Sequence, residues 1–171
     1  VLSAIALGAT YRTRTWVMEM LAAMEAKNEA GKRYTGDDIK VTLKPLAESG
    51  WVVEDSVRGP GYFRVPPDRM GDVLGPLLDG GDIPRWQAAL GRALDYRANE
   101  GLRYAYFQDM SAAVAVVRLA LLSGKPSAEV EQLRSACRWG MEWEAVVSEA
   151  LSCGLNSTLF MRLDDTLQHN E

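Results

Sequence analysis

Two adjacent prolines, Pro66 and Pro67, place the strongest constraint on how this sequence can fold. Proline has no backbone N–H and a fixed φ, so a strand cannot continue through the pair, whereas a helix can begin there. Both helical and strand-like patterns precede the prolines, and only helical patterns follow them. The sequence therefore predicts two domains, residues 1–67 and residues 68–171.

Two helices are expected before residue 35. A short apolar helix is predicted over residues 2–9, closed by Gly8. A longer helix is predicted from Thr13 or Thr15, either of which can act as an N-cap. Its apolar residues recur at helical spacing until a polar run, and Gly31 is expected to end it.

A third helix is predicted to begin at Thr35, because Thr-x-x-Asp is the pattern of a capping box. Its buried face is marked by Ile39, Leu43 and Leu46. Pro45 removes one helical hydrogen bond and is a point at which the helix can divide, and Gly50 is placed to close it in a left-handed turn. The outward residues are Asp37, Val41, Lys44 and Glu48, with Lys40 on the flank.

A β-hairpin is predicted directly after Gly50. The segments 51–54 and 62–65 are strand-like and flank a turn that contains Gly-Pro-Gly. This third helix, closed by glycine and followed at once by a hairpin, resembles the winged helix-turn-helix family, and the resemblance covers residues 1–67. It implies a third helix that can enter the DNA major groove and a hairpin wing that lies on the DNA backbone.

One hydrophobic core is expected in this first domain, formed by Trp16, Leu21, Ile39, Leu43, Leu46 and Trp51. The second domain is predicted to be an all-helical array of antiparallel helices, because the breaks between its helical patterns are short. The expected breaks lie near Gly80, Gly101, Gly124, Gly140 and Gly154. Gly75-Pro76 should kink or shorten the first of these helices.

The residues needed for common catalytic and cofactor chemistry are scarce. The single histidine, His169, lies in the C-terminal tail, and two cysteines are too few for a zinc site. Neither a P-loop nor a G-x-G-x-x-G turn is present. We therefore expect a non-catalytic chain without metal or cofactor. The longest apolar stretch, 112–122, is interrupted by Arg118 and is too short to span a membrane, so a cytoplasmic location without membrane partners is expected.

Charge is distributed unevenly between the two predicted domains. The chain has a net charge of -4, with nine cationic and eight acidic residues before residue 68 and ten and fifteen after it. An acidic second domain binds phosphate poorly, so any DNA contact is assigned to the first domain. The candidate nucleic-acid-binding residues are Lys40, Lys44, Arg58, Arg64 and Arg33, with Arg12, Arg14 and Lys32 as further cations.

The leading functional hypothesis is an accessory DNA-binding module whose helical domain docks to a protein partner or to the rest of its own chain. The alternative is a protein-interaction module in which the winged helix serves docking and no nucleic acid is bound. The layout of a winged helix before helices is also similar to accessory regions of bacterial Swi/Snf-like helicases. A start at Val1 suggests a longer protein, in which any ATPase would lie elsewhere.

Overall fold

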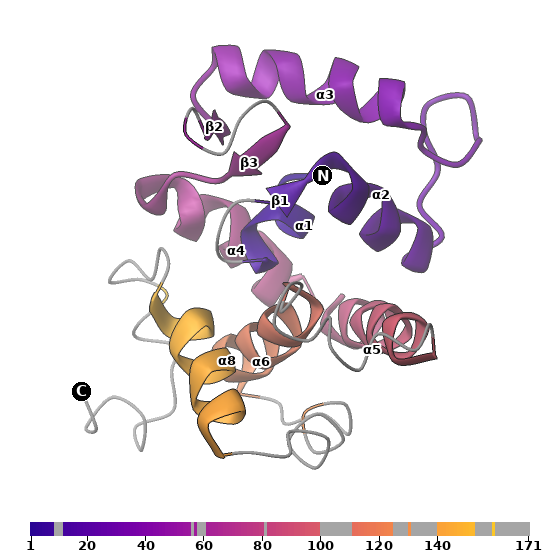
Figure 1. Cartoon of the computed structure of the whole chain (residues 1–171). Coiled ribbons are helices and arrows are strands. Elements are labelled where there is room, and N and C mark those ends of the chain that lie inside the picture. Colours follow the sequence, from indigo (N-terminus) through magenta and orange to yellow (C-terminus); the bar gives the residue numbers. More distant parts are fainter. Residues whose placement is uncertain are drawn as a thin grey trace.

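A computed structural model of the chain (Figure 1) is mostly helical and contains a small three-stranded antiparallel sheet. It describes residues 1–8, 12–55, 57, 61–80, 82–99, 111–124, 130, 140–152 and 159. Within these residues, no helix is both long enough and apolar enough to cross a bilayer.

Residues before the two prolines form three helices and the sheet. The elements are α1 (Leu2–Leu7), β1 (Arg12–Thr13), α2 (Arg14–Ala23), α3 (Gly36–Glu48), β2 (Val53–Glu54) and β3 (Tyr62–Arg64). Strand β3 lies in the middle of the sheet, between β1 and β2, and pairs antiparallel with both. The predicted hairpin is therefore confirmed, and β1 is a strand that the sequence patterns did not predict.

Helix α2 begins as predicted and ends earlier than predicted. The Thr13 hydroxyl accepts a hydrogen bond from the Trp16 backbone N–H at 3.2 Å. The expected end at Gly31 is wrong, because α2 closes at Ala23 and Glu25 takes a left-handed conformation with φ 55. The Ala26 N–H then bonds the Leu21 carbonyl at 2.9 Å, a Schellman-type closure in which glutamate takes the position usually held by glycine.

Helix α3 has the predicted start and end but is not divided. Thr35 and Asp38 form the predicted capping box, and Gly50 follows the helix with φ +75. The helix runs through Pro45 without interruption to Glu48. Proline is tolerated because Pro45 and Val41, whose carbonyl loses its helical partner, both lie on the exposed side, where water can bind that carbonyl.

Helices alone follow the prolines in the described residues, as predicted. They are η1 (Pro67–Arg69), α4 (Met70–Asp79), α5 (Ile83–Asn99), α6 (Ser111–Ser123) and α8 (Gly140–Ser152). Gly80 and Gly124 end helices, whereas Gly101 and Gly154 lie outside the described residues. Gly140 starts α8, and α4 continues past Pro76 to Asp79 rather than ending early.

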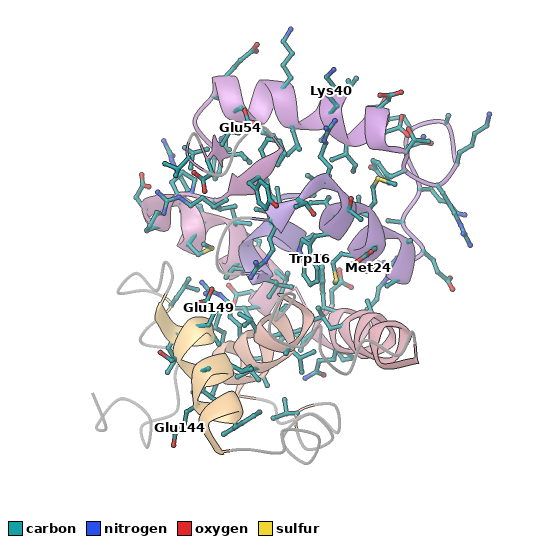
Figure 2. All side chains as sticks on the ribbon, in the orientation of Figure 1. Trp16, Met24, Lys40, Glu54, Glu144 and Glu149 are labelled. Atoms are coloured by element: carbon teal, nitrogen blue, oxygen red, sulfur yellow. The ribbon has the colours of Figure 1, made fainter. Side chains whose placement is uncertain are left out.

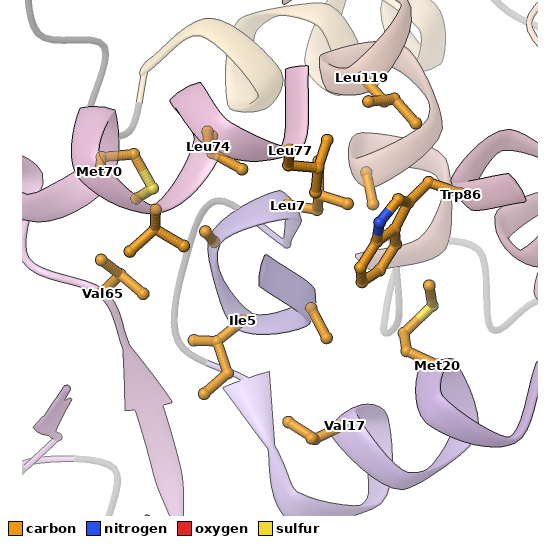
Figure 3. Packing of buried hydrophobic residues seen from close by; sticks show 14 of the residues in the cluster. Ile5, Leu7, Val17, Met20, Val65, Met70, Leu74, Leu77, Trp86 and Leu119 are labelled. Carbon is orange, nitrogen blue, oxygen red and sulfur yellow. The ribbon is translucent and has the colours of Figure 1, made fainter. Parts of the chain in front are cut away.

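The predicted core of the first domain is present. Trp16, Leu21, Ile39 and Leu43 are buried in one cluster, and Leu46 and Trp51 pack against its edge. The same cluster continues into α4, α5 and α6, where Leu74, Trp86 and Leu119 lie near Leu7 and Met20 (Figure 3). Apolar packing thus runs across residue 67, and the division into two domains stays a prediction.

Polar contact also joins the two parts of the chain. The Arg85 guanidinium, at the start of α5, donates to the carbonyl of Met24 at 2.9 Å. Met24 is the C-cap of α2, where a cation meets the negative end of the helix dipole. Helix α1 packs against α4 and α6, and α2 packs against α5. Helix α3 lies on the far side of α2 from these helices, at the outside of the molecule (Figure 1).

Candidate binding groove

An open groove of about 810 Å³ lies between α3 and the β2–β3 hairpin. Its walls come from three parts of the fold: the first residue of α2, the outer side of α3, and the hairpin. Figure 2 labels two lining residues, Lys40 on α3 and Glu54 on β2. The lining residues are Arg14, Asp37, Lys40, Val41, Leu43, Lys44, Ala47, Glu48, Glu54, Gly61 and Phe63. This is the volume range of many ligand-binding clefts, roughly 300 to 1,000 Å³.

The groove has an apolar floor. Leu43 and Phe63 are buried beneath it, and Val41 on α3 is 73% exposed. Phe63 faces the groove together with Glu54, its register partner on β2, because cross-strand partners point to the same face of a sheet. An exposed valine beside buried apolar residues extends the apolar surface into solvent, where another molecule can cover it.

The walls of the groove carry equal numbers of cations and carboxylates. The cations are Arg14, Lys40 and Lys44, and the carboxylates are Asp37, Glu48 and Glu54. The Glu54 carboxylate accepts a hydrogen bond from the Gly61 backbone N–H at 2.6 Å, which fixes it on the hairpin. Within the described part of the chain, no carboxylate lies within ion-pair distance of the three cations.

The N-terminus of α3 is held in place by a network around Asp38. Its carboxylate accepts hydrogen bonds from the Thr35 backbone N–H at 2.7 Å and from the Asn28 side-chain amide at 3.2 Å. The Thr35 backbone hydrogen bond is the largest cause of the lowered pKa of Asp38, followed by the Thr35 hydroxyl. Asn28 also accepts from the backbone of Ala30 and Lys32, so the preceding loop is tied to the helix.

The structure brings together two of the five residues predicted to bind nucleic acid. Lys40 and Lys44 line the groove, whereas Arg33 is exposed in the loop before α3 and does not line it. Arg64 follows Phe63 on β3, and successive strand side chains point to opposite faces, so Arg64 faces away from the groove. Arg58 lies outside the described residues.

Two further cations considered from the sequence, Arg14 and Arg12, lie in different environments in the structure. Arg14, the first residue of α2, lines the groove. Arg12 is buried, and its guanidinium donates to the Gly8 carbonyl and lies 5.9 Å from the centre of the Trp16 ring. Arg12 is therefore engaged within the fold, which is incompatible with the phosphate contact considered for it from the sequence.

The sequence patterns did not identify the hairpin wall of the groove. Phe63 and Glu54 belong to this wall, and the signal that could have found Phe63 is the alternation Tyr62-Phe63-Arg64, which predicts one inward side chain between two outward ones. Which face is inward depends on the pairing with β1 and β2, and that pairing is set by tertiary structure.

Comparison of the chain with protein-family models, with curated proteins and with solved structures finds no match in any of the three. Among the described residues, no group of three or more His, Cys, Asp or Glu side chains is placed to hold a metal ion. A function for the groove must therefore be argued from its own residues.

Proposed function

We propose that this chain is a binding module of the winged-helix kind that docks a protein partner in the groove between α3 and the hairpin. The observation that supports this best is the make-up of the groove, which has an apolar floor with Val41 exposed and walls that carry both signs of charge equally. Protein interfaces combine an apolar centre with a polar rim. A surface that binds a phosphate backbone needs a surplus of cations.

The order of elements supports the winged-helix part of the proposal. Three helices are followed by an antiparallel hairpin, and the third helix lies beside that hairpin with its outer face exposed. In winged helices this is the side on which the third helix meets its partner. Fold alone does not choose between DNA and protein as the partner, so the choice is made from the side chains.

Weak binding to duplex DNA is a second candidate function, supported by one observation. Arg14, Lys40 and Lys44 converge on one groove, and in the described residues none of them is neutralised by a carboxylate. They could contact phosphates if Asp37 and Glu48, at the two ends of α3, were kept at a distance from the duplex.

Salt-dependent binding separates these two candidates. A fluorescent duplex is titrated with the chain at several salt concentrations, using the parent and a Lys40→Glu/Lys44→Glu variant. Each phosphate contact contributes about 0.9 to the slope of log affinity against log salt. Protein docking predicts no saturable binding of the parent at low salt. Saturable binding with a slope near 2 or more, lost in the double variant, would replace docking with the DNA candidate.

Crosslinking tests directly whether a protein occupies the groove. A photoreactive phenylalanine derivative is placed at position 41 in the full-length chain, with position 57 as the matched control, since Val57 is 92% exposed and does not line the groove. Docking predicts a protein adduct from position 41 that survives nuclease and is absent from position 57. An adduct destroyed by nuclease would contradict the proposal.

A further inference from the structure

The charges along α3 are ordered, although their sum in the groove is zero. Asp37 lies in the first turn, Lys40 and Lys44 lie in the middle, and Glu48 is the last residue of the helix. With a rise of about 1.5 Å per residue, the two lysines are about 6 Å apart along the axis, and the two acids about 16 Å apart. The α3 wall of the groove is therefore cationic at its centre and acidic at both ends, and Glu54 adds a carboxylate from the hairpin wall.

Two of the three carboxylates are stabilised within the fold, although each keeps its charge. Asp37 lies in the first turn, where the positive end of the helix dipole stabilises a carboxylate. Glu54 accepts the Gly61 backbone N–H. The central cations have no such compensation in the described residues, and Arg14 reaches the same groove from α2. An occupant thus meets three cations that have no salt-bridge partner in the described residues, beside an apolar floor.

We infer that the occupant is a short acidic and apolar peptide segment of a partner protein. Its apolar side chain lies on Val41 and Phe63, and its carboxylate lies between Lys40, Lys44 and Arg14. The inference rests on the proposed docking function and adds the chemistry of the partner. A segment of about three helical turns matches the length between the two acids of α3, as in other complexes in which a peptide lies in an apolar groove.

The same arrangement disfavours the other occupants. A basic peptide could pair with Asp37, Glu48 or Glu54, but at the middle of α3 its cations would lie against Lys40 and Lys44. Nucleic acid would gain nothing from the exposed valine, and its many phosphates would meet Asp37 and Glu48 at the ends of the helix. A peptide needs only one carboxylate at the centre, and it covers the apolar floor at the same time.

Selection from random peptides tests this inference without a known partner. Peptides of about 12 residues displayed on phage are selected against the folded parent chain, and the enriched sequences are synthesised with a fluorescent label for anisotropy titrations. We expect enrichment of a large apolar residue together with Asp or Glu within about one helical turn of it. Enriched sequences that are basic or uncharged would overturn the inference and leave protein docking intact.

Matched variants locate the binding site. Val41→Ser should weaken the selected peptides at least about fivefold, because the change removes an apolar contact at the centre of the interface. Val57→Ser, an equally conservative change at an exposed valine outside the groove, should leave affinity unchanged. Equal effects of the two variants would overturn the inference.

A second pair of variants tests the charge of the groove. Lys40→Glu/Lys44→Glu should reduce affinity about tenfold or more, whereas Lys32→Glu/Arg33→Glu makes the same change of net charge on an exposed loop and should have little effect. All four positions are exposed, and circular dichroism verifies folding. If the groove variants do not weaken the binding of any selected peptide, the inference is wrong. If the duplex also binds with the steep salt dependence described above, the proposed function fails with it.

Discussion

Helices α3 and α6 have the same length, 13 residues, but α3 lies at the surface and α6 lies in the core. Only Ile39 and Leu43 of α3 are fully buried, whereas every residue of α6 from 113 to 119 is buried. Helix α6 packs against α5, α8 and α1, and α3 packs mainly against α2 (Figure 1). A helix that is apolar on all sides belongs in a core, and one with a single apolar stripe leaves its other face available for binding.

Cations on the two helices differ in the same way. Arg118 of α6 is 1% exposed, and its guanidinium donates to the Ala150 carbonyl of α8 at 3.1 Å. Lys40 and Lys44 of α3 extend into solvent. The buried cation of α6 therefore joins helices, and the exposed cations of α3 are available to a partner. Substitutions in the two helices should accordingly differ in what they damage.

The largest effect is expected for Arg118→Ala. The change removes a fully buried side chain and leaves the Ala150 carbonyl without this donor, so the free energy of unfolding should fall by about 3 to 5 kcal/mol. Urea denaturation followed by circular dichroism measures this loss. Glu144→Ala, at an exposed position of α8, is the control and should change stability little. A loss below about 1 kcal/mol for Arg118→Ala would contradict the central role of α6.

Leu43→Ala should have the next largest effect. Leu43 is 3% exposed in the core beneath α3, and loss of a buried leucine costs about 2 to 5 kcal/mol. The groove beside it lets neighbouring side chains relax into the space, so we expect about 2 to 3 kcal/mol. The same denaturation experiment tests this value. A cost equal to or above that of Arg118→Ala would show that α3 is as tightly packed as α6.

Thr35→Ala should cost about 1 kcal/mol, the usual value for loss of an N-cap. The Thr35 hydroxyl accepts the Asp38 backbone N–H at 3.2 Å, whereas the other half of the capping box, from the Thr35 backbone N–H to the Asp38 carboxylate, remains possible in the variant. Thr15→Ala, at an exposed position of α2, is the matched control. If both variants lose the same stability, the capping box does not hold the end of α3.

The lowered pKa of Asp38 gives a smaller, pH-dependent effect. A carboxyl group with a lower pKa in the folded state stabilises the fold above its unfolded pKa of about 4 and loses that contribution as pH falls through the folded value. The stability difference between the parent and Asp38→Asn should therefore be present at pH 7 and shrink below about pH 4. Thermal melts at both pH values measure the difference, and a gap that grows in acid would reverse the assigned sign.

Val41→Ser should leave stability within about 0.5 kcal/mol of the parent, because the side chain is already 73% exposed. This variant makes the contrast between the helices sharpest, since it should weaken binding of a partner and spare the fold. A loss of stability close to that of Leu43→Ala would mean that Val41 serves the core of the protein.

Local sequence patterns were sufficient to predict most helices and the residues of the core. The burial of Ile39 and Leu43 and the exposure of Val41 follow from helical spacing, and the capping box at Thr35 follows from a short motif. Strand β1 was missed because two residues contain no periodicity and form a strand only through pairing with β3. The end of α2 was misplaced because Glu25 takes a conformation for which glycine is the usual signal.

Only one wall of the candidate groove could be predicted from the sequence. The outward face of α3, with Lys40 and Lys44, could be deduced from a helical wheel. The opposite wall requires the position of the hairpin against α3, and Arg64 shows the difficulty. A one-residue change of register would exchange Arg64 with Phe63 and place a cation in the groove. Long-range pairing, which no local pattern encodes, decides between the two.

The position of α1 also has a consequence for how the chain folds. Its buried residues Ile5 and Leu7 belong to the cluster that includes Leu119 of α6, so the first helix of the chain packs against one more than 100 residues later. Contacts of such long sequence separation close late and slow folding. During synthesis, α2 and α4 emerge before α6 and can cover part of α1, but the apolar surface that α6 covers stays exposed until α6 has left the ribosome, and over that interval a chaperone can bind it.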